Sequence, residues 1–420
     1  MYIKRIYLEK IRCFDKLELE FPKPGTSALF LGDNGDGKST ILRCLAMGLC
    51  DRSSASALFR ELSGPFVRHA PDRPPPSAGE KGYIKIDLHN GDGEAYQIDT
   101  EIEIVHDFET VDQHLWKIEG DSKEPVGPLE FPWDRVFVAG YGPGLRTAGT
   151  QDYPRYVAVN AVYPLFVNDQ PLQNPELIIL RLLRTYGERP LWNNIQLLMA
   201  ELLDLKSPGD FELTTTGLTV TSFWGTAGLS QLGDGYQATI TWVLDLISSW
   251  FLRESANTNG VLELESVKGI AIIDEIEQHL HPKWQRRILP SLIRRFPNVQ
   301  FVVATHSPLV ASSSKDVEVH QLREGRRLQK VKPYGWLAEN VYSMMGLHSR
   351  PEQFEEETLA RYTELDRKKV EGTATRDEIE EWKRTTEVLV AMLPEGDPIA
   401  VSMRVANMLE SLNAKGGTQD

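Results

Sequence analysis

Hydrophobic and polar residues alternate with a period of two along several short segments near the N-terminus, a pattern typical of half-buried strands. These segments are residues 2–8, 17–21, 84–88 and 96–98, with 102–104 as an extension of the last. Residues 12–15 predict the turn between the first two strands, and Asn-Gly-Asp-Gly at 90–93 predicts a hairpin between the second two. Residues 51–80, which contain many Ser, Pro and Arg residues, show no period and predict a loop or mobile insert.

Continuous apolar runs elsewhere in the chain predict strands that are buried on both faces. They are residues 27–31, 135–139, 269–273 and 299–304. We expect residues 160–206 to be mostly helical, residues 211–223 to alternate again as strands, and residues 236–253 to form a helix. A further helix over 282–296 separates the last two apolar runs, and this spacing fits a βαβ unit with parallel strands.

Composition narrows the class of protein. A chain of 420 residues, 41% hydrophobic and 25% charged, is typical of a soluble globular protein with two or three domains. Three cysteines without a Cys-x-x-Cys pair favour the reducing cytoplasm. Because no apolar run reaches about 18 residues and charges interrupt the N-terminus, we expect neither a membrane span nor a signal peptide. The net charge of −14 argues against coating nucleic acid through bulk charge, although it permits a local basic groove.

Residues 32–40 carry the most specific motif, Gly-Asp-Asn-Gly-Asp-Gly-Lys-Ser-Thr, which fits the P-loop pattern G-x-x-x-x-G-K-[ST]. An apolar strand precedes it and a predicted helix over 41–47 follows it, as the pattern requires. Glycines let backbone N–H groups close around phosphate oxygens, and the helix N-terminus adds positive potential. We expect a nucleotide to contact Gly32, Asn34, Gly35, Gly37, Lys38, Ser39 and Thr40. In this set Lys38 reaches the β- and γ-phosphates of ATP, and Ser39 holds Mg²⁺.

The apolar strand at 269–273 ends in two acids, Asp274 and Glu275, the Walker B arrangement. Because Mg²⁺ held by Ser39 still needs a carboxylate, we expect this strand beside the P-loop strand, with Asp274 as a metal ligand directly or through water. Glu275 then lies near the γ-phosphate and orients or deprotonates the attacking water. The next strand ends at His306, whose imidazole can donate a hydrogen bond to the γ-phosphate.

The P-loop, the Asp-Glu pair and the strand ending in histidine together resemble the core of ABC-type ATPases of the RecF, SMC and Rad50 kind. The resemblance spans residues 1–50, 135–145 and 226–312. It includes the Arg-Cys-Phe turn at 12–14 after the first strand. Residues 140–142, 274–285 and 296–301 look closer to the short prokaryotic ATPases of anti-phage defence. That group includes the ATPase subunit of Septu systems, which works beside an HNH nuclease and is also found with some retrons.

This resemblance implies an α/β fold: an ABC-type P-loop ATPase head with a mixed β-sheet, a helical insertion lobe and a C-terminal helical extension. The expected domains are an ATPase lobe at 1–150, a mainly helical insertion at 151–228, the rest of the ATPase at 229–335 and an acidic helical extension at 336–420. The resemblance further implies ATP and Mg²⁺ as cofactors, Arg12 as part of the nucleotide site, and a homodimer or higher oligomer bridged by nucleotide.

In such dimers a Leu-Ser-x-Gly signature from one subunit faces the ATP of the other. The matching stretch is 231–237, and Gly233 and Gly235 within it are the expected nucleotide contacts. Gly233 stands where the family usually has serine, which removes one hydroxyl donor unless the register differs and Ser230 is used. For His279 and His281, after Walker B, we expect contact with the dimer partner or a helix cap rather than a metal pair.

Beyond the nucleotide motifs, charged helices are expected at about 352–371, 376–392 and 398–412. They form either a solvated tail packed on the ATPase or an acidic docking platform for a basic partner such as a nuclease. No nuclease motif is present in the sequence, so if DNA is cut, we expect another subunit to cut it. The leading hypothesis is a slow ATPase that senses a phage component or DNA and controls a partner nuclease. The alternatives are a RecF-type DNA repair or replication ATPase with a basic groove, and an ATP-bound scaffold that sequesters an effector.

Overall fold

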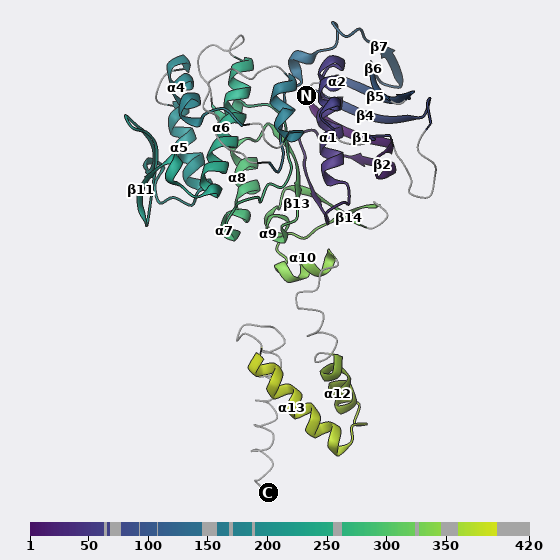
Figure 1. The fold of residues 1–420 in the computed structure, drawn as a ribbon, viewed down its shortest axis with the longest axis vertical. Coiled ribbons are helices and arrows are strands. Elements are labelled where there is room, and N and C mark those ends of the chain that lie inside the picture. Colours follow the sequence, from purple (N-terminus) through teal and green to yellow (C-terminus); the bar gives the residue numbers. More distant parts are fainter. Residues whose placement is uncertain are drawn as a thin grey trace. The chain divides into compact units, whose positions relative to one another are not determined.

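The computed structural model describes residues 1–62, 65–67, 77–91, 93–106, 108–144, 158–167, 171–186, 190–254, 263–323, 327–345 and 360–392. The chain divides into two compact units, Met1–Val341 and Tyr342–Asp420. In the first unit, two six-stranded sheets and a group of helices form a mixed α/β fold, as the sequence predicts (Figure 1). Within the described residues, no helix has both the length and the apolar character needed to cross a membrane.

The N-terminal sheet is antiparallel and has the strand order β2-β1-β4-β5-β6-β7. Its strands are β1 (Tyr2–Ile11), β2 (Phe14–Glu20), β4 (Lys81–His89), β5 (Ala95–Val105), β6 (Phe108–Glu119) and β7 (Ser122–Pro125). The predicted first pair of strands and the predicted hairpin of β4 and β5 are confirmed. The sequence analysis missed β6 and β7. The reason is a weak pattern, because β6 buries only Val111 and Leu115 and β7 is exposed throughout.

Helix α1 (Lys38–Gly48) contacts strands of both sheets, among them β4 and β13, and is buried over most of its length. Helix α2 (Arg52–Arg60) follows it and packs on β6, so the expectation of a loop over 51–80 is wrong for this part (Figure 1). The local cause is an N-cap: the Asp51 carboxylate accepts from the backbone N–H groups of Ser53 (3.0 Å) and Ser54 (3.1 Å). The prolines at 71–76 lie outside the described residues.

The second sheet has the order β15-β14-β3-β13-β12-β8 and is parallel except for β15. Its strands are β3 (Ser27–Leu31), β8 (Val138–Tyr141), β12 (Gly269–Ile273), β13 (Val299–Thr305), β14 (Val317–Arg323) and β15 (Arg327–Val331). The sequence analysis expected the Walker B strand β12 to lie beside the P-loop strand β3, and this expectation is wrong. Strand β13 lies between them and pairs with both. The predicted strand at 135–139 begins later, because residues Trp133–Arg135 form a 3₁₀ turn.

The helical part of the first unit confirms the prediction for 160–206. Its helices are α3 (Ala158–Val162), α4 (Pro175–Tyr186), α5 (Pro190–Leu202) and α6 (Asp234–Glu254). A small sheet of β9 (Phe211–Thr214), β10 (Gly217–Ser222) and β11 (Gly225–Gly228) forms where the sequence alternates again. Further 3₁₀ turns occupy Tyr163–Leu165, Pro208–Asp210, Leu229–Gln231 and Leu264–Ser266.

The helix predicted over 282–296 is broken into α7 (Pro282–Gln285) and α8 (Ile288–Arg295). Pro290 supplies a physical reason: in one continuous helix its ring would clash with the carbonyl of Arg286 and it could not donate to it. In the observed structure Pro290 falls in the first turn of α8, where proline is tolerated. Helix α9 (Pro308–Ser313) belongs to the first unit, and α10 (Ala338–Met344) contains the boundary between the two units, at Val341 and Tyr342.

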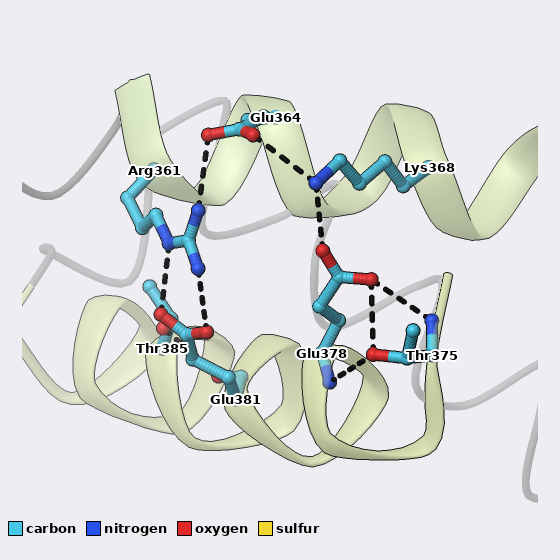
Figure 2. Close-up of polar contacts among 7 residues, drawn as sticks. All are labelled: Arg361, Glu364, Lys368, Thr375, Glu378, Glu381 and Thr385. Atoms are coloured by element: carbon cyan, nitrogen blue, oxygen red, sulfur yellow. Dashed lines mark hydrogen bonds and ion pairs between the residues drawn. The ribbon is translucent and has the colours of Figure 1, made fainter. Parts of the chain in front are cut away.

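After the end of α10, the described part of the second unit is a pair of helices, α12 (Ala360–Val370) and α13 (Arg376–Met392). The predicted helix at 376–392 is confirmed, whereas residues 352–359 and 398–412 lie outside the described residues. Figure 2 shows how charged side chains join the two helices. Arg361 donates to both carboxylate oxygens of Glu381, at 2.8 and 2.7 Å, and Lys368 contacts Glu364 and Glu378.

Candidate functional site

Three parallel strands of the second sheet end at the same edge, and each end carries one of the predicted motifs. The P-loop follows β3, His306 follows β13, and Asp274 follows β12. A pocket of about 290 Å³ lies at this edge. Its lining contains Arg12, Cys13, Asp33, Asn34, Gly35, Gly37, Lys38, Ser39, Thr40, Asp274, Glu275 and His306. The structure therefore brings together most of the predicted site residues, although the P-loop lies more than 200 residues before Asp274 and His306 in the sequence.

The remaining predicted residues lie elsewhere. Gly32 is part of the P-loop, where its carbonyl accepts a hydrogen bond from Lys38, but it does not line the pocket. Gly233 and Gly235 do not line it either. A larger cavity of about 560 Å³ opens at the opposite end of β3 and β14, between Thr26, Val317 and Lys332. That cavity contains none of the motif residues, so we assign the chemistry to the smaller pocket.

The P-loop packs closely against the turn between β1 and β2. Gly37 has a φ of 102°, a left-handed conformation that glycine adopts without strain. A Cβ at this position would lie 2.5 Å from the Cys13 sulfur and from Phe14 Cζ, so a side chain has no room. Gly37 is also the N-cap residue of α1, so the free N–H groups of the first helical turn face the loop. The loop thus forms a backbone cradle of the kind that binds phosphate.

The side chain of Lys38 is 5% exposed, and its ammonium donates to the carbonyls of Gly32 and Asp33, both at 2.8 Å. Burial lowers the pKa of Lys38, against the opposing effect of the nearby Asp274 and Asp36 carboxylates. A buried ammonium needs anionic partners, and a polyphosphate is one that this pocket can admit.

Arg12 reaches the pocket from the β1–β2 turn, where it has a left-handed φ of 43°. Its backbone N–H donates to the carbonyl of Phe66 at 2.7 Å, and its guanidinium lies 4.9 Å from the centre of the Phe66 ring. Non-glycine residues in this conformation are uncommon and concentrate at functional sites. The structure thus places Arg12 at the predicted site, where its guanidinium packs against the Phe66 ring.

The two acids after β12 differ in their surroundings. Asp274 is 1% exposed and its backbone N–H donates to the carbonyl of Tyr141 at 2.8 Å. Glu275 is half-buried and has a left-handed φ of 48°. Burial raises the pKa of Glu275, and the negative charges of Asp274 and Glu277 raise it further. A carboxylate with a raised pKa is a stronger proton acceptor, as a general base requires.

The sequence analysis missed the residue that supports His306. The carboxylate of Glu277 accepts the Thr305 hydroxyl and the His306 backbone N–H, both at 2.6 Å. Glu277 does not line the pocket. Its only signal in the sequence is a third acid two positions after the Walker B pair, and nothing in that spacing shows which backbone group the acid contacts.

The signature stretch lies at the start of α6. Gly235 packs against the loop after Walker B so tightly that a Cβ would overlap the His279 carbonyl. Beside it, the rings of Tyr236 and Trp284 meet edge to face with centroids 4.4 Å apart. A Cβ at Gly233, in contrast, meets nothing within 4 Å. The structure thus explains Gly235 by packing within one subunit, and the nucleotide contacts of both glycines stay predictions.

The nearby His281 side chain caps α7, because its Nδ1 accepts from the Lys283 backbone N–H at 3.2 Å. Of the roles expected for His279 and His281, the helix cap is therefore confirmed for His281.

Two segments of the chain match families of ATPase domains. Residues 5–124 match the AAA domain family, and residues 228–312 match a family described as "AAA domain, putative AbiEii toxin, Type IV TA system". These segments contain all the motif residues of the pocket. The chain thus carries an AAA/ABC-type ATPase domain.

Among curated proteins, the chain is distantly homologous to three named relatives. It is 34% identical over 27% of its length to "Retron Ec83 probable ATPase" of Escherichia coli, and 35% identical over 29% to "Retron Vc95 probable ATPase" of Vibrio cholerae. It is 25% identical over 77% of its length to "Septu protein PtuA" of Bacillus mycoides. The matched parts span 21%, 23% and 41% of these relatives' own lengths, which is less than half in each case.

Solved structures of SMC head domains are similar to this chain at low sequence identity and with TM-scores below 0.5. The "SMC head domain from Thermotoga maritima" has a TM-score of 0.44 and 14% identity, covering 79% of this chain and 99% of that one. An SmcHead bound to the C-winged helix domain of ScpA has a TM-score of 0.48 and 14% identity, covering 79% and 98%.

Proposed function

We propose that this chain binds ATP with Mg²⁺ in the pocket at the end of β3, β12 and β13, and hydrolyses it slowly. One observation carries the proposal: the P-loop, Asp274, Glu275 and His306 line a single pocket. Each motif alone occurs in other settings, but their convergence at the carboxyl edge of a parallel sheet is the arrangement that phosphoryl transfer needs.

The residues present fit a nucleotide triphosphate. The backbone cradle around Gly37 and the buried ammonium of Lys38 accept phosphate oxygens. Ser39 and Asp274 line the same pocket and offer a hydroxyl and a carboxylate, the oxygen ligands that Mg²⁺ prefers. When bound there, Mg²⁺ supplies charge neutralisation for the β- and γ-phosphates.

Three residues of the chain have separate roles in hydrolysis. Glu275 orients the attacking water and accepts its proton. His306 donates a hydrogen bond to the γ-phosphate, and Arg12 adds positive charge at the rim of the pocket. Because Lys38 and Asp274 are buried, their charges act in surroundings that contain little water, where electrostatic interactions are strong.

We further propose that two copies bind face to face across nucleotide, with Gly233–Gly235 of one copy at the ATP of the other. In one subunit these glycines do not line the pocket, as a site shared between two copies requires. Binding would close the dimer and hydrolysis would open it, so the protein acts as a switch.

The biological role we propose is that of a cytoplasmic sensor or regulator in anti-phage defence, which controls a partner nuclease. Likeness to the retron ATPases and to Septu protein PtuA supports this role. The RecF-type alternative needs a basic groove. On the antiparallel sheet, several of the described cations are paired with carboxylates instead, for example Arg5 with Asp87 and Lys81 with Glu101.

The direct test measures ATP binding and phosphate release by the purified chain, with Mg²⁺ and with EDTA in its place. We expect Mg²⁺-dependent turnover and ATP-dependent dimerisation in sedimentation experiments. Binding without any turnover would instead favour a nucleotide-gated scaffold, and failure to bind ATP would contradict the proposal. Copurification of a nuclease with the tagged chain from its own host tests the defence role separately.

A further inference from the structure

We propose that Glu277 is a positioning residue, whose carboxylate clamps the end of β13 to the loop after Walker B and so holds His306 at the nucleotide pocket. Its part in turnover rests on the ATP hydrolysis proposed above. Glu277 itself does not line the pocket, so it acts through the residue that it holds.

The clamp is built from two short hydrogen bonds to consecutive residues. One carboxylate oxygen accepts the Thr305 hydroxyl and the other accepts the His306 N–H, both at 2.6 Å. Bonds to an ionised carboxylate are about twice as strong as neutral ones. Thr305 is fully buried, so a lost bond there is not replaced by bulk water. Together the two bonds hold the Thr305 side chain and the 305–306 peptide, and with them the position of the backbone from which the His306 side chain extends.

A second set of bonds closes the clamp into a ring. The Thr305 hydroxyl oxygen accepts the Ser307 N–H at 2.9 Å, and the Ser307 hydroxyl donates to the Gln285 side-chain carbonyl at 2.7 Å. The Gln285 amide then donates to the Leu280 carbonyl at 2.9 Å. The end of β13 is therefore tied to the loop after Walker B at Glu277 and again at Leu280. A closed network of this kind holds its members more rigidly than one contact does.

The geometry also explains why a carboxylate is needed. Both partners of Glu277 are donors, and one of the two lone pairs of the Thr305 oxygen already accepts the Ser307 N–H. A glutamine has one acceptor oxygen and one donor nitrogen, so it can satisfy only one of the two donors. Glu277→Gln thus keeps the size of the side chain and breaks the clamp.

The experiment compares Glu277→Gln, Thr305→Val and Thr305→Ser with the parent chain. ATP affinity is measured by titration with a fluorescent ATP analogue, and hydrolysis by single-turnover phosphate release. Because His306 acts on the transition state, we expect Glu277→Gln and Thr305→Val to slow hydrolysis about 10-fold and to change affinity less than about 3-fold. Thr305→Ser keeps the hydroxyl and should restore the parental rate.

The chain offers a matched control in Glu378 of the second unit. Its carboxylate likewise accepts a threonine hydroxyl and a backbone N–H, both from Thr375, at 3.0 and 2.9 Å (Figure 2). Glu378→Gln makes the same side-chain change outside the nucleotide motifs, at a site where a single oxygen, Oε2, accepts from both Thr375 donors. We expect it to hydrolyse ATP at the parental rate.

A double substitution separates positioning from general damage to the fold. If the clamp acts through His306, the variant carrying both His306→Ala and Thr305→Val, which keeps the Glu277 charge near Glu275, should be no slower than His306→Ala alone. Multiplying effects, or a parental rate for Glu277→Gln, would overturn the inference while leaving the ATPase proposal intact. Absence of hydrolysis by the parent would instead defeat the proposed function. Even then, amide hydrogen exchange over residues 299–307 tests whether the clamp exists. Exchange should be faster in Glu277→Gln than in the parent, and equal exchange rates would refute the clamp.

Discussion

Asp274 and Glu275 are neighbours in the sequence, yet the backbone gives them different surroundings. Asp274 ends the buried strand β12 and is 1% exposed, whereas Glu275 turns away through a left-handed φ of 48° and is half-buried. Because burial and adjacent negative charge raise the pKa of Glu275, it holds a proton more readily than an exposed carboxylate does. These environments suit a metal ligand and a general base, respectively.

Glu275→Gln keeps the size of the side chain and removes its ability to accept a proton. We expect ATP binding to persist and hydrolysis to fall by roughly 10²-fold or more, as measured by phosphate release at saturating ATP. Lys38→Ala should lose ATP binding itself, because the buried ammonium is the main cation of the P-loop. A Glu275→Gln variant that hydrolyses ATP like the parent would show that another residue is the base.

His320 on β14 predicts a pH dependence of stability. Its side chain is 5% exposed, and burial lowers its pKa to about 4, against the opposing effect of Glu318. The unfolded chain protonates this histidine near pH 6.5, so stability is full above that pH and is lost as pH falls toward 4. Between pH 7.5 and 5 the loss should be about 2 kcal/mol.

Urea unfolding of the parent and of His320→Gln at both pH values measures this effect. Other titrating groups are common to the two proteins and cancel in the comparison. The parent should lose about 2 kcal/mol more than the variant between pH 7.5 and 5. Equal losses would mean that His320 is protonated in the folded state.

At the residue scale, the sequence predicted the groups that line the pocket better than the groups that hold them. Lys38, Asp274, Glu275 and His306 follow apolar strands within recognisable motifs, and the structure brings them together. The role of Glu277 could not be predicted from such motifs, because its partners Thr305 and His306 are 28 and 29 residues away in the sequence. Such contacts depend on how two loops meet in space, which no local pattern encodes.

At the scale of elements, the start of α6 allows a test of the dimer. Gly233→Ser restores the hydroxyl that the family signature usually has, and a Cβ there meets nothing within 4 Å. We expect ATP-dependent association to tighten by about 1 kcal/mol, or roughly fivefold, from one added hydrogen bond. Sedimentation in a Glu275→Gln background measures this without interference from turnover.

Gly235→Ser is the matched control, because a Cβ there overlaps the His279 carbonyl. It should lower the midpoint of urea unfolding, whereas Gly233→Ser should leave that midpoint unchanged. If Gly233→Ser folds normally but weakens association or leaves it unaltered, the signature uses another register, with Ser230 as the first candidate.

The elements that the sequence predicted well have strong periods or definite ends. The buried strands β3, β12 and β13 and the helix α13 belong to this group. The elements that were predicted wrongly have local causes that the hydrophobic periodicity does not show. An aspartate N-cap starts α2, and a proline breaks the helix after Walker B. The order of the parallel strands, with β13 between β3 and β12, follows from tertiary packing and not from the order of motifs.

At the scale of the whole molecule, the nucleotide pocket belongs entirely to the unit Met1–Val341. Several charged side chains of the described helices α12 and α13 pair with each other. Arg361 contacts Glu364 and Glu381, and Lys368 contacts Glu364 and Glu378 (Figure 2). An acidic docking surface therefore depends less on these described helices than on the Glu-rich stretch at 352–357, which lies outside the described residues.

Truncation of the chain after Gly346 tests whether the second unit is a docking platform. It keeps α10 and every strand of both six-stranded sheets. We expect a soluble protein whose ATP turnover is close to that of the full chain, because no pocket residue is removed. The truncated chain should lose the partner in a pull-down and lose protection against phage in cells.

Partner binding by the full chain should weaken as salt rises, since exposed charges are screened over about 8 Å at 0.15 M. Aggregation or lost ATP binding would show instead that these helices stabilise the ATPase. If the truncated chain is soluble and still binds the partner, the docking platform lies in the helical part of the first unit instead.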